Sequence, residues 1–233
     1  MKKPLIILTG PTAVGKTAAS IGLAKAIGGE IISADSMQVY RHMDIGSAKI
    51  RSKEMQGISH HLIDVLEPEE EFHVVKFQQM AKEALDGIYQ RGHIPIVVGG
   101  TGFYIQALLY DISFEDNEED HSYRKELEEL AQEEGAEKLH QMLRQVDEKA
   151  ALEIHANNVK RVIRALEFYH QTGEKISEHN AKEREKESAY NSAYFVLNDD
   201  RANLYERINK RVDAMFEEGL VEEVTALQER GYT

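Results

Sequence analysis

The chain of 233 residues contains no cysteine. A disulfide framework and a metal site with cysteine ligands are therefore excluded, and a reducing compartment suits the sequence. No apolar run approaches the length of about 20 residues that a membrane-spanning helix needs. The start, MKKPLIIL, resembles a signal peptide, but its apolar run is too short and leads directly into a glycine-containing loop. These absences predict a soluble cytoplasmic protein with no membrane partner.

Basic residues are also scarce, because 28 Lys and Arg face 41 Asp and Glu, which gives a net charge of −13. Such a balance disfavours a polyanionic partner, since nucleic acids are bound largely through their phosphates. The acids are concentrated in stretches such as EDNEED, ELEELAQEEGAE and EREKE, which are typical of solvated helix faces and loops. A local basic surface can therefore still bind RNA.

What is present, almost at the start, is the stretch GPTAVGKT. The apolar run PLIILTG before it predicts a buried strand, and TAASIGLAKAIGG after it predicts a helix. The pattern G-x-x-x-x-G-K-[ST] in this context is typical of a loop whose backbone N–H groups bind phosphate. Lysine adds a point charge, and the final hydroxyl is a ligand for Mg²⁺. The expected binding residues are Gly10, Pro11, Thr12, Ala13, Val14, Gly15, Lys16 and Thr17.

Further strand and helix patterns follow the loop. EIISADS, HHLIDVLEP and IPIVVGG are strand-like apolar runs, and FHVVKFQQMAKEALDGIYQRG and TGFYIQALLYD have helical spacing. This alternation predicts an α/β fold, in which a parallel sheet has helices on both faces. Ligands of such sheets bind at the carboxyl ends of the strands, which is where Gly10, Asp35 and Gly99 fall.

The character of the sequence changes near Ser113. From there almost every segment has the pattern of a charged amphipathic helix, until AYFVLN returns to a strand pattern followed by two further helices. We therefore expect a core of residues 1–112, an all-helical insertion at 113–190, and a resumed core at 191–233.

A phosphate-binding loop alone leaves several functions open. A GTPase is disfavoured because the chain has no N-K-x-D stretch. A nucleotide or small-molecule kinase stays an alternative with the insertion as its lid, although such lids need several arginines and this insertion is dominated by acids. The non-enzyme alternative is a phosphate-loop RNA-binding module, against which the presence of Asp35, Lys16 and Thr17 argues.

Seven blocks of sequence carry a resemblance to a known family. In order they are GPTAVGKT, DSMQVYR (35–41), DIGSAK (44–49), HHLID (60–64), VGGTGFY (98–104), KRVIRALE (160–167) and RINKRVDAMFEEGLVEEV (207–224). Together they resemble the bacterial tRNA dimethylallyltransferases, also called tRNA isopentenyltransferases. Ser47 stands where the family commonly has threonine.

The resemblance implies a fold like that of phosphate-loop NTPases and an unusual use of the loop. The donor would be dimethylallyl diphosphate, the acceptor N6 of the adenosine 3′ to the tRNA anticodon, and the leaving group diphosphate, with Mg²⁺ as cofactor and no obligate protein partner. Family members typically continue past Thr233 through further helices that help to hold the tRNA. We therefore expect this chain to bind diphosphate, but to bind tRNA weakly.

An aromatic exocyclic amine is a poor nucleophile, so a carboxylate that removes its proton would accelerate the reaction. Asp35 is the candidate general base, with a Mg²⁺-binding or helix-capping carboxylate as the alternative. The resemblance assigns Thr101 to the target adenosine, although a helix N-cap is its simpler interpretation. It assigns Arg211 to the diphosphate, although a solvated helix face explains that arginine equally well.

The acceptor base must leave its stack to reach such a site. Asp35, Ser36, Met37 and Gln38 would line the channel that receives it. In the insertion, charge alone is equally consistent with an exposed helix face, and the resemblance favours contacts to the anticodon stem-loop by Lys160, Arg161, Arg164 and, as a weaker candidate, Arg124. We assign no metal to His60 and His61, because adjacent residues of a strand point to opposite faces.

Overall fold

The computed structural model describes residues 2–113 and 122–232. The chain forms two compact units, of which the first contains Met1–Ile112 and Ser188–Thr233 and the second Ser113–Glu187. The boundaries expected from the sequence were 113 and 190. In the described residues no helix is both long and apolar enough to cross a membrane.

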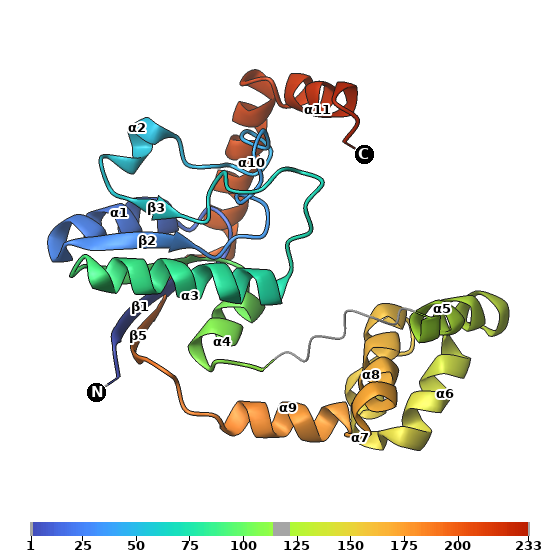
Figure 1. The fold of residues 1–233 in the computed structure, drawn as a ribbon. Helices are drawn as coiled ribbons and strands as arrows, with labels where there is room; N and C mark the ends of the chain where they lie inside the picture. Colours follow the sequence, from blue (N-terminus) through green and yellow to red (C-terminus); the bar gives the residue numbers. More distant parts are fainter. Residues whose placement is uncertain (1, 114–121, 233) are drawn as a thin grey trace. The chain divides into compact units, whose positions relative to one another are not determined.

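The first unit is built on a five-stranded sheet with the order β3-β2-β4-β1-β5. Figure 1 labels β1, β2, β3 and β5 of this sheet. All neighbouring pairs are parallel. The parallel sheet expected from the alternating pattern is therefore confirmed. The strands are β1 (Pro4–Thr9), β2 (Gly29–Ser33), β3 (His60–His61), β4 (Ile94–Gly99) and β5 (Asn191–Val196).

Helices account for most of the rest of both units. The helices of the first unit are α1 (Lys16–Ile27), α2 (Ser52–Met55), α3 (Val74–Gln90), α4 (Gly102–Leu109), α10 (Arg201–Glu217) and α11 (Leu220–Glu229). Those of the second are α5 (Ser122–Glu134), α6 (Ala136–Val146), α7 (Glu148–Glu153), α8 (Val159–Thr172) and α9 (Ile176–Glu185).

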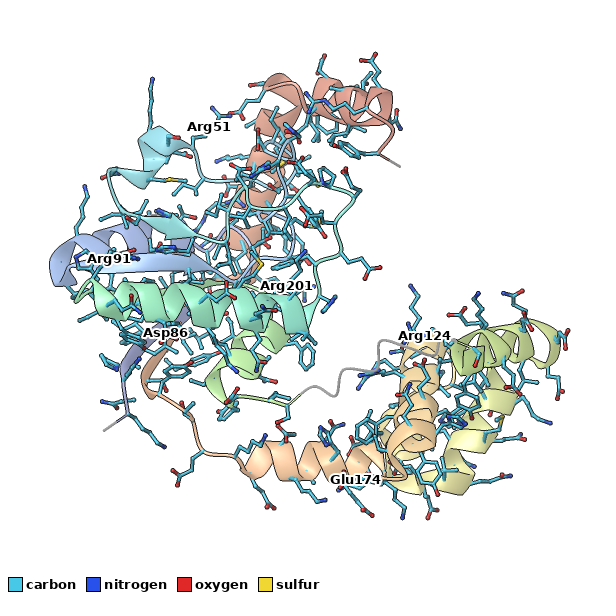
Figure 2. The ribbon with its side chains drawn as sticks, viewed as in Figure 1. Arg51, Asp86, Arg91, Arg124, Glu174 and Arg201 are labelled. Atoms are coloured by element: carbon cyan, nitrogen blue, oxygen red, sulfur yellow. The ribbon has the colours of Figure 1, made fainter. Side chains whose placement is uncertain are left out.

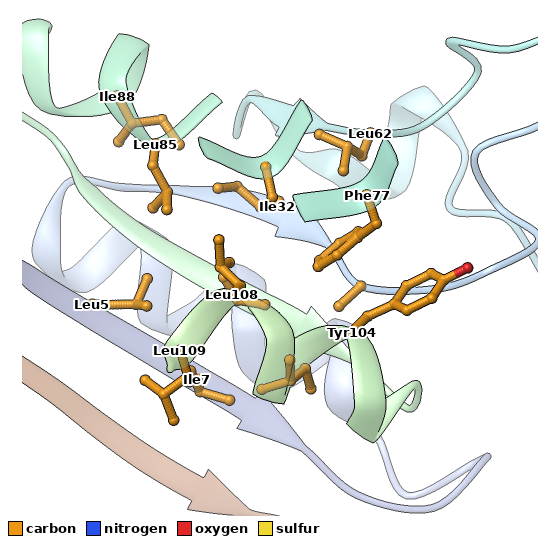
Figure 3. Packing of buried hydrophobic residues seen from close by; sticks show 14 residues of the cluster. Leu5, Ile7, Ile32, Leu62, Phe77, Leu85, Ile88, Tyr104, Leu108 and Leu109 are labelled. Carbon is orange, nitrogen blue, oxygen red and sulfur yellow. The ribbon is translucent and has the colours of Figure 1, made fainter. Parts of the chain in front are cut away.

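Alternation along the strands gives the sheet two apolar faces. Ile32 and Val97 point to the face that α3 and α4 cover, where they form one cluster with residues such as Phe77 (Figure 3). Their neighbours Ile31 and Ile96 belong to a second cluster, which α1 completes on the other face. Because successive side chains of a strand point to opposite faces, these runs of apolar residues bury both sides of the sheet.

The third strand is shorter than the sequence suggests. The apolar run HHLIDVLEP is extended only at His60–His61, because Leu62 and Asp64 have φ angles of 62° and 53°. Such left-handed backbone cannot continue a strand. Leu62 is nevertheless buried, so the apolar residue serves the core from a turn.

The second unit has a hydrophobic core of its own. Leu127 of α5, Leu139 and Leu143 of α6, and Val162 and Leu166 of α8 are all almost completely buried and form a single cluster. The apolar residues recur at helical spacing, so each helix turns one stripe inward and leaves its charged residues in solvent.

Candidate active site

The glycine-containing loop joins the end of β1 to the start of α1, and its shape depends on its glycines. Gly10 has a φ of 148°, and a Cβ atom there would lie 2.4 Å from the backbone oxygen of Leu197. Gly15, directly before α1, has a φ of 95°. A residue with a side chain would be strained at both positions. The loop therefore brings backbone N–H groups to the positive end of a helix, which is the arrangement that binds phosphate.

Lys16 lies half-buried at the mouth of this loop. Its Nζ donates hydrogen bonds to the backbone oxygens of Gly10 (2.9 Å) and Pro11 (2.8 Å). Burial lowers the pKa of Lys16, the negative charge of Asp35 acts against that shift, and the positive charge of Arg211 adds to it. The three predicted site residues therefore lie close enough to interact electrostatically, although they come from distant parts of the sequence.

Asp35 follows the end of β2 and is half-buried. Its Oδ1 accepts hydrogen bonds from the backbone N–H groups of Met37 (2.9 Å) and Gln38 (3.3 Å). The carboxylate thus caps a turn of residues 35–38, whereas the capping alternative expected from the sequence was a helix cap. Within residues 2–113 and 122–232 no hydrogen bond or ion pair uses its second oxygen, so one oxygen anchors the group and the other is available to a ligand.

Thr101 is held beside Asp35 by the close approach of β4 to β2. A Cβ atom on Gly99 would lie only 2.1 Å from the backbone oxygen of Ala34, so only glycine fits there. The backbone N–H of Thr101 donates to that same oxygen (3.3 Å). Thr101 stands at the N-cap of α4, but its side chain makes no capping hydrogen bond. The simpler interpretation as a helix N-cap is therefore correct for the position of Thr101, and its hydroxyl makes no hydrogen bond to the helix.

Arg211 and a second arginine of α10 approach the loop from the carboxyl-terminal part of the chain. The Arg207 guanidinium donates to the backbone oxygen of Ala13 (3.2 Å) and forms an ion pair with Asp199. Ala13 has a φ of 63°, so this contact holds the loop at a strained residue. The sequence analysis assigned no role to Arg207, although its spacing of one helical turn from Arg211 was an available signal.

Thr17 is exposed in the first turn of α1, where it can offer its hydroxyl to a metal ion. The described residues contain no group of three or more His, Cys, Asp or Glu side chains arranged to hold a metal. Mg²⁺ usually keeps several waters and is bound through substrate phosphates with one or two protein ligands. The donor set therefore fits a Mg²⁺ ion that arrives with a diphosphate.

The basic residues predicted to bind tRNA lie in the second unit. Lys160, Arg161 and Arg164 are exposed on α8, and no ion pair involves them within the described residues. Arg124, labelled in Figure 2, differs. Its Nε and an Nη donate to the two carboxylate oxygens of buried Glu167 at 2.9 and 2.8 Å. The guanidinium of Arg124 is therefore already committed inside the helical unit.

Three charged residues that sequence reasoning did not assign make many contacts in the first unit. The Lys49 side chain is 3% exposed and lies between the carboxylates of Asp44 and Asp64. The Glu223 carboxylate accepts hydrogen bonds from consecutive backbone N–H groups. Glu30 is buried at the amino end of β2. Lys49 and Glu223 lie within the family-like sequence blocks 44–49 and 207–224. The blocks could therefore have drawn attention to both residues, but not to their contacts.

Comparisons with known proteins agree on one family. A family model described as IPP transferase matches residues 38–233. The tRNA dimethylallyltransferase of Lachnoclostridium phytofermentans is 64% identical over 230 residues, which cover 99% of this chain and 74% of that relative. The tRNA dimethylallyltransferase of Geobacillus thermodenitrificans is 52% identical over 231 residues, covering 99% and 73%.

Solved structures give the same result. The tRNA delta(2)-isopentenylpyrophosphate transferase of Staphylococcus epidermidis is 44% identical, with a TM-score of 0.66 over 99% of this chain and 75% of that one. A eukaryotic dimethylallyltransferase, solved acting on tRNA, is 34% identical, with a TM-score of 0.85 over 98% of this chain and 56% of that one.

Proposed function

Because the chain belongs to the tRNA dimethylallyltransferase family, we propose that it transfers a dimethylallyl group from dimethylallyl diphosphate to N6 of the adenosine 3′ to the tRNA anticodon. One observation supports this assignment most directly. The loop follows β1 and Asp35 follows β2, on either side of β4, and the two lie close enough for the charge of Asp35 to act on the pKa of Lys16. A leaving diphosphate and an acceptor amine can therefore be served by one site.

On the donor side, negative charge grows on the diphosphate as its bond to carbon breaks. The backbone N–H groups of the loop, Lys16 and Arg211 are positioned to stabilise that charge, which is how preorganised donors accelerate a reaction. A guanidinium binds phosphate oxygens well because it can donate two parallel hydrogen bonds. When bound, Mg²⁺ supplies further positive charge to the diphosphate, and Thr17 is the residue that would hold it.

On the acceptor side, the second oxygen of Asp35 takes the proton that N6 must lose. The N6–carbon bond forms while the bond between that carbon and the diphosphate oxygen breaks, and the N6 proton passes to Asp35. General base catalysis of this kind typically contributes about 100- to 10,000-fold. Fixing Oδ1 by two backbone N–H groups holds the carboxylate in one orientation for the transfer.

The acceptor adenosine must be turned out of the anticodon loop to reach Asp35. The Thr101 hydroxyl is half-buried beside Asp35 and engaged in no cap, so it is positioned to bind that nucleoside. Ser36, Met37 and Gln38 continue from Asp35 and would line the entrance. Lys160, Arg161 and Arg164 are suited to the phosphates of the anticodon stem, because each is exposed on α8.

The decisive experiment incubates the protein with labelled dimethylallyl diphosphate, Mg²⁺ and unmodified tRNA in the absence of ATP. We expect label to enter the RNA and diphosphate to be released, and unlabelled diphosphate to compete with the donor. A tRNA with guanosine in place of the target adenosine is the matched control. Label transfer that requires ATP and consumes it would favour the kinase alternative, and absence of transfer would contradict the proposal.

A further inference from the structure

A turn of residues 43–49 lies next to the start of α11 and presents an unusual arrangement of backbone donors. The Glu223 carboxylate accepts three consecutive N–H groups, with Oε2 bonded to the nitrogens of Asp44 and Ile45 (2.7 Å each) and Oε1 to that of Gly46 (2.9 Å). Consecutive N–H groups that converge in this way form an anion-binding nest. Here the bound anion is a side chain that lies 177 residues or more along the chain.

Two further contacts show that α11 packs against this turn. Arg51, which follows the turn, forms an ion pair with Glu218 just before α11. A Cβ atom on Gly46 would lie 3.2 Å from Cδ1 of Leu220, so a side chain larger than hydrogen would crowd the helix. The Glu223 contact is therefore part of a packed junction between α11 and the turn.

The turn is also fixed from within. Ala48 and Lys49 donate backbone hydrogen bonds of 2.9 Å to the oxygens of Ile45 and Asp44. The buried Nζ of Lys49 contacts the backbone oxygen of Tyr40 (2.6 Å) and the carboxylate of Asp44 (2.6 Å). A buried cation that is fully paired holds its surroundings in one geometry, because any rearrangement would leave charge unpartnered. The turn is therefore rigid, so a displacement on its α11 side should also displace the residues that contact its other side.

On its other side the turn carries Gln38. The Nε2 of Gln38 donates to the backbone oxygens of Ser47 (3.4 Å) and Ala48 (3.3 Å). The backbone N–H of the same residue donates to Oδ1 of Asp35 (3.3 Å). A continuous series of contacts thus runs from Glu223 through the 43–49 turn to Gln38 and Asp35.

We propose that Glu223 is a positioning residue for the acceptor side of the site: by holding the nest, it fixes the turn that orients Gln38 and, through it, Asp35. This inference rests on the proposed function for its kinetic consequence, whereas its structural part stands alone. Within the described residues, the hydrogen bonds of the Glu223 carboxylate go to the turn and not to the phosphate-loop residues. Its loss should therefore impair use of tRNA and leave binding of the donor nearly unchanged.

The test compares Glu223→Gln with Glu222→Gln, which removes the same charge from the adjacent, exposed residue of α11. A glutamine at 223 leaves at least one N–H group of the nest without an acceptor and turns its own NH₂ toward donors. We expect hydrogen exchange at residues 44–46 to accelerate in Glu223→Gln alone. We also expect kcat/KM for tRNA to fall about tenfold, as displacement of a positioned group by a fraction of an ångström can do.

The affinity for diphosphate should stay within about twofold of the wild type in both variants, which also reports that the core is folded. A second comparison uses Gln38→Ala, alone and combined with Glu223→Gln. If Glu223 acts through Gln38, the double variant should lose much less than the product of the single losses, because coupled residues are not additive. Three results would overturn the proposal. The losses in kcat/KM for tRNA could multiply in the double variant, the affinity for diphosphate could fall as much as kcat/KM for tRNA, or hydrogen exchange at residues 44–46 could stay unchanged in Glu223→Gln.

Stronger tRNA binding by Glu223→Gln would also overturn the proposal. If an RNA phosphate displaces Glu223 from the nest, then Glu223→Gln should strengthen tRNA binding, and the residue would be a competitor and not a positioning group. Failure of the wild type to label tRNA would contradict the proposed function instead. In that case the exchange comparison still decides whether Glu223 fixes the turn.

Discussion

At the amino end of the sheet, a buried carboxylate is surrounded by one arginine and two histidines. Glu30, whose side chain is 4% exposed, receives two hydrogen bonds of 2.8 Å from Arg91. The rings of His61 (2.7 Å) and His93 (2.6 Å) complete the group. Both oxygens of the carboxylate are thus engaged, and the partners come from β3, from the segment before β4 and from the end of α3, which carries Arg91 (Figure 2).

At the carboxyl end, charged groups are left incompletely paired. Among the described residues, Lys16 bonds only backbone oxygens, and Asp35 uses one oxygen for backbone N–H groups. Arg211 is exposed, with no ion pair to any residue within 2–113 and 122–232. A cluster whose charges satisfy one another stabilises the fold, whereas groups held close without being paired remain available to a ligand. By this difference, the cluster around Glu30 is expected to stabilise the fold, whereas the one around Lys16 and Asp35 is the proposed site.

The largest effect that this comparison predicts is that of Asp35→Asn. Asparagine keeps the size of the side chain and its bonds to the backbone N–H groups, but it cannot take a proton. Single-turnover prenylation of saturating tRNA should slow by about 100-fold or more, with little change in tRNA affinity or in the free energy of unfolding. A Mg²⁺ series is the control, because full rescue at high Mg²⁺ would make Asp35 a metal-binding residue.

For Glu30→Gln we expect the free energy of unfolding to fall and the rate of prenylation to change little. The hydrogen bonds from Arg91, with those from His61 and His93, outweigh burial and lower the pKa of Glu30 from 4.5 to about 2. A carboxyl group with a lowered pKa stabilises the fold fully above its ordinary pKa, and this contribution is lost as the pH falls from about 4.5 toward 2. A shift of this size corresponds to about 3 kcal/mol in the free energy of unfolding.

Urea unfolding between pH 7 and pH 3 measures this contribution directly. The wild type should lose stability over the acid range, and Glu30→Gln should already be less stable at pH 7 and change less as the pH falls. The rate of prenylation per folded molecule should stay within about twofold of the wild type, because Glu30 lies at the end of the sheet away from the site. A large loss of turnover in a folded variant would remove the distinction between the two ends.

The sequence was sufficient for the sheet and for the proximity of Lys16 to Asp35, because the elements that position them are encoded locally. The predicted phosphate-binding loop needs eight consecutive residues between a strand and a helix, and Asp35 and Thr101 follow strands that are mainly apolar. Parallel strands then bring their carboxyl ends together, so residues far apart in the sequence meet without any long-range pattern. The fold and the proximity of Lys16 to Asp35 follow from these rules.

The sequence was insufficient where a residue acts through a distant partner. Glu30 looks like a polar interruption in a strand, and its partners Arg91 and His93 follow it by 61 and 63 residues. Glu223 is one of two acids in the first turn of α11, and only the packing of α11 on the 43–49 turn distinguishes it from Glu222. Charge pairing between distant segments depends on tertiary structure, and composition and periodicity carry no record of it.

The second unit allows the same comparison between a paired and an unpaired arginine. Arg124→Gln removes both hydrogen bonds to Glu167, whose side chain is 5% exposed. A buried carboxylate without its partner is costly, and because Arg124 itself is partly exposed we expect a loss of about 2 kcal/mol in the free energy of unfolding. Thermal or urea unfolding checks this, and Glu167→Gln in the same background should recover part of the loss. A variant of unchanged stability would show that the pair is dispensable.

The smallest effect is expected for Arg164→Gln, on the exposed face of α8. Because the guanidinium makes no ion pair within residues 122–187, its loss should leave the free energy of unfolding within about 0.5 kcal/mol of the wild type. If Arg164 neutralises one RNA phosphate, tRNA affinity should fall a few-fold, and the slope of log affinity against log salt should become shallower by about 0.7–0.9. Filter binding of unmodified tRNA between 50 and 200 mM salt measures both quantities. Lys138→Gln is the matched control, since that lysine is already paired with Glu134 on the same unit. An unchanged salt slope for Arg164→Gln would place the RNA elsewhere and make the basic face of α8 a solvated surface.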